Sequence, residues 1–247
     1  MLLANMTFQQ FLQNPTGPYS AFFGKRENIK QDLNKRFYTL LGNTKKKEFD
    51  CKVYKKENSY YFHIKIPSEK FSTLLYDVII KLVPQDTSVL VENTLKNYNL
   101  QFFSNSPAFV YTYAYVSKKD KLLLPFLENK LNKQALTKPP TIKNPIEIYG
   151  FEKSIYFALL YIEYKNYHIK SALPVVMQKN FKETDIVRNC RHSDDIMKEY
   201  NLEKQKEKAK KDAEKRKLHK YKIASNNKKA NATRVKRNKV IKPKKKL

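Results

Sequence analysis

Glycine is scarce in this sequence, with only four residues among 247. They are Gly17, Gly24, Gly42 and Gly150, and no two of them lie closer than seven positions. Phosphate-binding loops need several glycines within one turn, because the backbone must approach the phosphate closely. The sequence therefore excludes dinucleotide-binding folds and P-loop folds.

Cysteine and histidine are also few, with two and four residues. Cys51 and Cys190 lie 139 positions apart, which favours two free thiols in a reducing compartment. Cys190 and His192 are two positions apart, and such a lone pair does not make a zinc site. No histidine pair has ligand spacing. We therefore expect neither a metal nor another cofactor.

Long apolar runs are missing as well. The longest, residues 155–162, has eight residues, whereas a membrane span needs about 20. Residues 1–6 are too short and too uncharged for a secretory signal. We expect no membrane span and no secretion through a signal peptide.

Acidic residues are absent from the last 33 positions, 215–247, which hold 15 Lys or Arg. The whole chain has a net charge of +27, and residues 188–247 contribute +16 of it. The few apolar residues of the last 33 are scattered, so burial cannot offset a backbone entropy of roughly 1–2 kcal/mol per residue. We predict that residues 222–247 form a disordered or extended tail that requires a densely anionic partner to become ordered.

Nucleic acid is the partner that this tail predicts. The chain has 43 Lys against 7 Arg, and lysine neutralises phosphate as a point charge, whereas arginine reads guanine edges. An AT-rich coding sequence would also raise the lysine content. We expect phosphate contacts that are independent of base sequence. The predicted nucleic-acid-binding residues are Lys215, Arg216, Lys217, Lys220, Lys222, Lys228, Lys229, Arg234, Lys236, Arg237, Lys239, Lys242, Lys244, Lys245 and Lys246.

Other interpretations of the charge stay open. An anionic membrane surface or an acidic protein surface would attract the same lysines. A large net charge also serves solubility alone. Solubility does not require every acid to be excluded from 33 consecutive positions, so the segregation of charge favours a binding partner.

Hydrophobic periodicity predicts an α+β body over residues 1–187, with an antiparallel β-sheet core and flanking helices. A capping box, Thr7 to Gln10, predicts a short first helix. Ser193 with two following acids predicts the start of a charged helix within 188–221. Further helices are expected at 29–42, at 121–131, either continuous or broken at Pro125, and at 151–164. Strands are expected at 49–53, 60–66, 76–83, 100–103 and 109–116.

Aromatic residues alternate in the last of these expected strands, at Phe109, Tyr111, Tyr113 and Tyr115. Alternating aromatics on a strand most often pack in a core or in a subunit interface. With lysines close behind, they also fit a platform on which the bases of a single strand stack. The sequence leaves core, interface and stacking platform open.

A carboxylate-based enzyme is the least favoured interpretation. Asp50 and Asp77 fall on expected strands with lysines nearby, and two carboxylates are what a Mg²⁺-dependent nuclease uses. In a chain with 30% charged residues such combinations arise by chance. We therefore expect a protein that is not an enzyme.

Two segments, Ser104–Tyr115 and Lys143–Ile162, resemble uncharacterised structural proteins of tailed bacteriophages with AT-rich genomes. The resemblance covers about residues 75–165 and implies a virion protein of head, neck or tail, found in the virion or in the host cytoplasm. We therefore expect a structural component of a large nucleoprotein assembly that binds nucleic acid and other structural proteins. The alternative is a ribosome-associated or RNA-binding factor.

Overall fold

The computed structural model describes residues 6–13, 29–44, 47–140, 152–174 and 182–240, and side chains in the last of these ranges up to Ile223. The chain divides after Tyr200 into two compact units, residues 1–200 and 201–247. We call the first unit the body and the second the C-terminal unit. The body thus includes residues beyond 187, where we had expected it to end.

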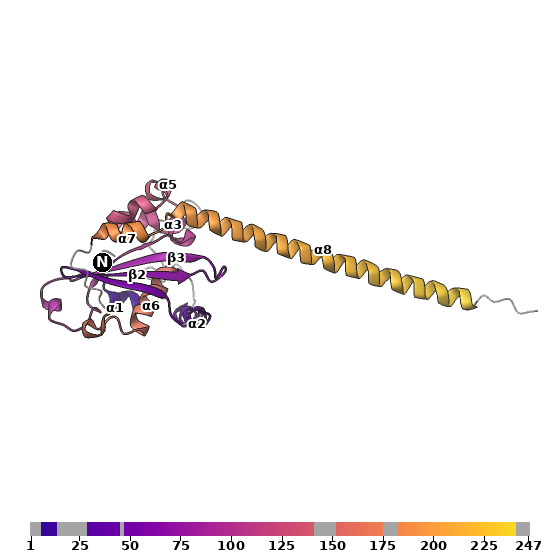
Figure 1. The fold of residues 1–247 in the computed structure, drawn as a ribbon, viewed down its shortest axis with the longest axis horizontal. Coiled ribbons are helices and arrows are strands. Elements are labelled where there is room, and N and C mark those ends of the chain that lie inside the picture. The colour runs from indigo at the N-terminus through magenta and orange to yellow at the C-terminus, as the bar shows by residue number, and fades with distance from the viewer. Residues whose placement is uncertain (1–5, 14–28, 45–46, 141–151, 175–181, 241–247) are drawn as a thin grey trace, which may run out of the picture. The chain divides into compact units, whose positions relative to one another are not determined.

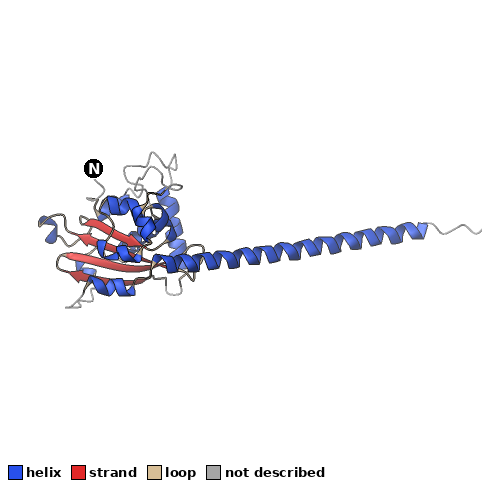
Figure 2. Cartoon of the chain, turned by 90° about the horizontal axis from the view of Figure 1, so that it is seen from above, coloured by secondary structure: helices blue, strands red, loops and turns tan. Residues whose placement is uncertain are grey.

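A four-stranded antiparallel sheet lies at the centre of the body (Figure 2). Its strands are β1 (Asp50–Lys56), β2 (Ser59–Pro67), β3 (Leu75–Val83) and β4 (Asn99–Ser104), and their order in the sheet follows the sequence. The strands expected at 49–53 and 60–66 form a hairpin: Lys56 pairs with Ser59 across a two-residue turn whose first residue, Glu57, has a φ of 53°. The predicted α+β class is correct.

Three helices lie on one side of the sheet: α1 (Phe8–Gln13), α2 (Ile29–Gly42) and α6 (Lys153–Tyr164) (Figure 1). Buried residues of the strands, including Phe62, Ile80 and Phe102, form this apolar face. The ring of Phe11 in α1 packs edge-on against Phe102. The predicted capping box holds α1, because the Thr7 hydroxyl accepts from the Gln10 amide while the Gln10 side chain accepts from the Thr7 amide.

The 3₁₀ helix η4 (Pro125–Lys130) and α7 (Glu183–Asn189) lie over the opposite side. Three short helices follow β4 in the sequence: α3 (Pro107–Thr112), α4 (Ala114–Lys119) and α5 (Lys133–Thr137). Tyr61 of β2 anchors η4 and α7. Its hydroxyl donates to Glu183 over 2.6 Å, and its ring packs against Phe126. Two further 3₁₀ turns, η3 (Ser88–Leu90) and η5 (Lys170–Ala172), lie in connections.

Two predicted elements are wrong. Residues 109–116 are helical, because Ser106 caps α3 by accepting from the Phe109 amide and Pro107 fits the first turn. Residues 121–131 hold only η4, because Pro125 lacks the amide that a helix from 121 would need there. Leu123 instead pairs with Phe102 of β4.

The helix α8 runs from Ser193 to Val240 and makes up the described part of the C-terminal unit. The prediction of an extended tail from residue 222 is therefore wrong up to Val240. Burial is not the only source of helix formation: lysine, arginine and alanine all favour helices, and neither glycine nor proline occurs between Ser193 and Val240. Residues 241–247 of the predicted tail lie outside the described residues.

Candidate nucleic-acid interface

The first two turns of α8, residues 193–200, belong to the body and pack against its other residues. Asn132, which caps α5, donates from its backbone to the Ser193 hydroxyl over 2.9 Å and from its side chain to Asp194 over 3.0 Å. Ile196 is buried with Phe71, and the ring of Tyr200 packs edge-on against Phe71. The acids of the first helical turn also suit the positive end of the helix dipole. The helix is therefore held at its start.

A buried hydrogen-bond cluster holds the chain just before α8. Asp77 of β3 accepts from the backbone of Arg191 over 3.1 Å and from His63 of β2 over 2.7 Å. Asn105 bridges the two segments, since its side-chain amide donates to Asp77 and to the Arg191 carbonyl, each over 3.1 Å. The connection between α7 and α8 is thereby tied to the centre of the sheet.

Along α8 the charge changes at residue 215. Residues 201–214 hold five basic and four acidic side chains, whereas residues 215–247 hold 15 basic and no acidic ones. In the first stretch Lys206 pairs with Glu203 over 2.8 Å, and Lys211 pairs with Glu207 over 2.6 Å. The pair Asp212–Arg216, which the i,i+4 spacing suggests, is not formed between these described side chains. Past Glu214 the helix is purely cationic.

The predicted binding residues divide into three groups. Lys215, Arg216, Lys217, Lys220 and Lys222 are exposed on α8, and no carboxylate among the described side chains lies within ion-pair distance of them. Lys228, Lys229, Arg234, Lys236, Arg237 and Lys239 lie on the helical backbone. Lys242, Lys244, Lys245 and Lys246 lie outside the described residues.

Helix geometry sets how these cations are displayed. At 1.5 Å per residue, Lys215–Val240 spans about 39 Å, and successive side chains turn by about 100°. Basic residues at adjacent positions, such as Lys215, Arg216 and Lys217, therefore face different directions. An array without a defined pocket attracts phosphate by charge and does not select bases.

The two carboxylates considered for a nuclease are kept apart. Asp50 on β1 and Asp77 on β3 both pair in register with Lys65 of β2, so they lie two strands, about 10 Å, from each other. Asp50 is exposed, whereas Asp77 is buried among its hydrogen-bond donors. Within the described ranges, no three His, Cys, Asp or Glu residues are grouped to hold a metal ion. The geometry gives Mg²⁺ chemistry no site at this pair.

Asp77 is held as a carboxylate. Burial alone would raise its pKa, but the hydrogen bond and charge of His63, the Arg191 amide and the charge of Lys65 together hold the pKa of Asp77 below its ordinary value. A carboxyl with a lowered pKa is a poor proton carrier at neutral pH. Asp77 therefore acts as a structural acceptor.

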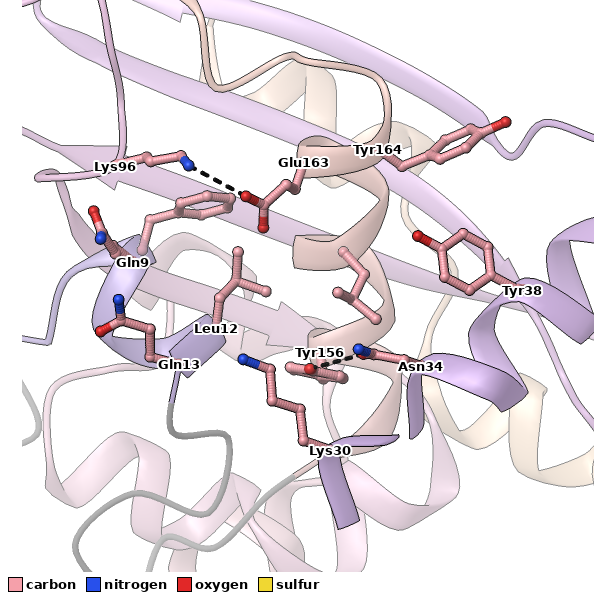
Figure 3. A pocket seen from close by; sticks show the side chains of 12 residues that line it. Gln9, Leu12, Gln13, Lys30, Asn34, Tyr38, Lys96, Tyr156, Glu163 and Tyr164 are labelled. Atoms are coloured by element: carbon pink, nitrogen blue, oxygen red, sulfur yellow. Dashed lines mark hydrogen bonds and ion pairs between the residues drawn. The ribbon is translucent and has the colours of Figure 1, made fainter. Parts of the chain in front are cut away.

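A cavity of about 380 Å³ lies between α1, α2 and α6 (Figure 3). Apolar side chains, among them Leu12, form part of its wall, and two pairs of polar side chains lie on its rim. Lys96 binds Glu163 over 3.2 Å, and the Tyr156 hydroxyl donates to Asn34 over 3.0 Å. These pairs involve four of the polar lining residues, whereas the side chains of Gln9, Gln13 and Lys30 form no hydrogen bond with a described residue.

A second cavity of about 480 Å³ lies between α3, α4 and α5, and we call it the tyrosine pocket. Two of the alternating aromatic residues noted in the sequence, Tyr111 and Tyr115, line this pocket, while Phe109 is fully buried in the core. The sequence pattern did not reveal this pocket because its opposite wall comes from α5 and the residues after it. That wall includes Asn132, Gln134, Ala135, Lys138, Pro139 and Pro140.

Comparisons with family models, curated proteins and solved structures gave no match to this chain. The resemblance to bacteriophage structural proteins therefore stays a prediction. In the part of the chain that the structure describes, no helix has the length and apolar character needed to cross a bilayer.

Proposed function

We propose that this protein is a non-enzymatic structural component of a large nucleoprotein assembly and that it binds nucleic acid through the basic part of α8. A single observation supports the proposal. From Lys215 to Val240 a helix carries cations and no acidic residue, and its cations up to Lys222 are exposed. Such a surface repels itself, and a polyanion removes that repulsion.

Ion pairs in the body support separate roles for the body and for the basic part of α8. Many of its cations are already paired with carboxylates: Arg36 and Lys153 both bind Glu69, Lys118 binds Glu128, and Lys165 binds Glu48. A lysine that already has a carboxylate partner gains less from a phosphate. Residues 201–247 contribute +16 of the net charge of +27, so the excess of positive charge per residue is highest there, and we assign to the body the contacts with other structural proteins of the assembly.

Binding would proceed by counterion release. Each phosphate that a lysine neutralises frees a condensed cation from the nucleic acid, so affinity falls as salt concentration rises. With about eight contacts the slope of log K against log salt is near −7 for duplex DNA. The same mechanism makes binding indifferent to base sequence.

Truncation tests the proposal. A chain ending at Glu214 should lose most of its affinity for duplex DNA at low salt, while circular dichroism should still report the folded sheet and helices of the body. A truncated chain that binds as tightly as the full one would refute the assignment to α8.

The assembly we propose is the virion of a tailed bacteriophage, with the protein in its head, neck or tail or in the host cytoplasm before assembly. The resemblance of Ser104–Tyr115 and Lys143–Ile162 supports this choice. A ribosome-associated or RNA-binding factor would use the same helix on structured RNA. Competition between duplex DNA and structured RNA for the full chain separates the two, since a virion DNA contact should not prefer RNA.

A further inference from the structure

We infer that the tyrosine pocket binds one base of single-stranded nucleic acid, stacked on a tyrosine ring. This inference rests on the proposed function and specifies which form of nucleic acid the body contacts. It starts from the position of Tyr111, whose side chain is 43% exposed although it belongs to a helix packed on the core. A large aromatic side chain left open beside a cavity is a surface on which another flat group can stack.

The pocket has the size and the walls that a base requires. Its volume of about 480 Å³ falls within the 300–1,000 Å³ that is typical of ligand sites. Tyr111 and Tyr115 supply aromatic surface, and Pro139 and Pro140 supply apolar surface. Base stacking on an aromatic side chain contributes about 1–3 kcal/mol and tolerates any base, because every base has a π face.

Polar groups of the pocket are available to a ligand. The hydroxyls of Tyr111 and Tyr115 and the side-chain amide of Gln134 form no hydrogen bond with the residues that the structure describes. Asn132 is different, since its side chain accepts from the Gln134 backbone over 2.9 Å and donates to Asp194. In the cavity between α1, α2 and α6, two polar pairs are already formed, Lys96 with Glu163 and Tyr156 with Asn34. Gln134 is thus the free amide that a base edge would meet.

The charge around the pocket favours an anionic ligand. Lys138, which directly follows α5, lines the pocket, and Lys133 begins α5. Both side chains are exposed, and neither has a carboxylate partner among the described residues. A phosphate attached to the stacked base would be placed next to cations. Apolar walls alone would also suit a proline-rich peptide, but such a peptide gains nothing from these lysines.

Only unpaired bases can enter. In a duplex the base faces are covered by neighbouring bases, so the pocket requires a single strand, a loop or an end. The cations of α8 bind any polyphosphate, whereas the tyrosine pocket adds a requirement for a base. The two contributions can therefore be measured separately on the full-length protein.

A tryptophan reporter tests the inference directly, because the natural chain contains no tryptophan. The variant Tyr111→Trp places one fluorophore at the pocket, and a stacked base should quench its emission. Oligothymidylate should quench it, while inorganic polyphosphate, which has no bases, should bind without quenching. The matched control is Tyr38→Trp on α2, at a tyrosine that is 58% exposed and lies outside the pocket, and its emission should not respond.

Affinity measurements supply a second readout. Tyr111→Ala should weaken oligothymidylate binding by about 5- to 150-fold and leave polyphosphate binding unchanged. Tyr111→Phe keeps the ring and should bind oligothymidylate like the natural protein. Absence of quenching when oligothymidylate is bound, equal losses for both polyanions, or quenching by a proline-rich peptide instead would overturn the inference. If polyphosphate itself does not bind, the proposed function of α8 fails, which is a separate result.

Discussion

His63 on β2 and Asp77 on β3 form a 2.7 Å hydrogen bond inside the body, and both side chains are almost fully buried. The same carboxylate accepts from the backbone of Arg191, two residues before α8 begins. A buried carboxylate is costly unless its donors surround it, and here strand, loop and helix connection all supply donors. Asp77 therefore couples the stability of the sheet to the position of the start of α8.

Removing this carboxylate should destabilise the body strongly. Asp77→Ala leaves His63, Asn105 and the Arg191 amide without their shared acceptor, and breaking a buried pair costs about 3–5 kcal/mol. Urea unfolding, followed by circular dichroism at pH 7, measures the loss. Asp50→Ala is the matched control, because Asp50 is exposed on β1 and should change the free energy of unfolding by no more than about 0.5 kcal/mol. Equal effects of the two substitutions would contradict this role of Asp77.

The contribution of Asp77 should also depend on pH. Its pKa is lowered in the folded protein relative to an unfolded value of about 3.9, so the folded state favours the carboxylate. The resulting stability is complete above that unfolded value and is lost as pH falls through the lower folded pKa. The difference in unfolding free energy between the natural protein and Asp77→Asn should stay constant from pH 7 to about 5 and shrink below about 4. A difference in unfolding free energy that grows as the pH falls would contradict a lowered pKa of Asp77 in the folded protein.

Thiol chemistry should be suppressed in the folded protein. Burial, helped by the nearby Asp50 carboxylate, raises the pKa of Cys51 to about 12, and burial raises that of Cys190 as well. Since the thiolate is the reactive form, alkylation by iodoacetamide at pH 8 should be slow until the protein is unfolded. Mass spectrometry after a timed reaction counts the modified cysteines. Rapid alkylation of both cysteines under native conditions would contradict this prediction, because it would show that both thiols are accessible and reactive in the folded protein.

The helical structure of α8 should be separable from its positive charge in DNA binding, because the charge alone makes the phosphate contacts. Leu218 is 57% exposed on α8, and a proline there removes a backbone donor and costs about 3 kcal/mol of helix stability. Leu218→Pro should lower the helical signal in circular dichroism. It should change the slope of log K against log salt for DNA binding by less than about 0.9, the value of one phosphate contact, because no charge is lost. Leu218→Ala should preserve both. A large loss of slope in the proline variant would mean that the helix itself, and not its charge, makes the contacts.

The sequence predicted the sheet well because its signals are local. Alternation over Phe49–Val53 and Tyr60–Ile66, joined by a polar turn, depends only on neighbours in the chain and specifies one face to bury. The same reasoning failed at Phe109–Tyr115. The alternating aromatics suggested a strand, but the capping serine and the proline in front of them start a helix.

Other features depend on residues far apart in the sequence and could not be predicted. Asp77 meets Arg191 across 114 positions, and Tyr111 shares a pocket with Lys138, which follows another helix. The tail illustrates a different error. Counting apolar residues for burial predicted an extended chain, whereas the intrinsic helix preference of lysine and arginine needs no burial at all.

The central claim is that unpaired cations from Lys215 onward bind nucleic acid, and the salt dependence of binding tests it most directly. Changing Lys215, Arg216, Lys217, Lys220 and Lys222 together to Gln removes a third of the fifteen cations and, with about eight contacts spread evenly over them, should lower the magnitude of the log K against log salt slope by about 2.4. The matched control changes Lys204, Lys206, Lys208, Lys210 and Lys211 to Gln in the nearly neutral stretch of the same helix. It removes the same charge and should change the slope by less than about 1. Equal slopes for the two variants would contradict the account, because the net charge of the chain and not this segment would then determine binding.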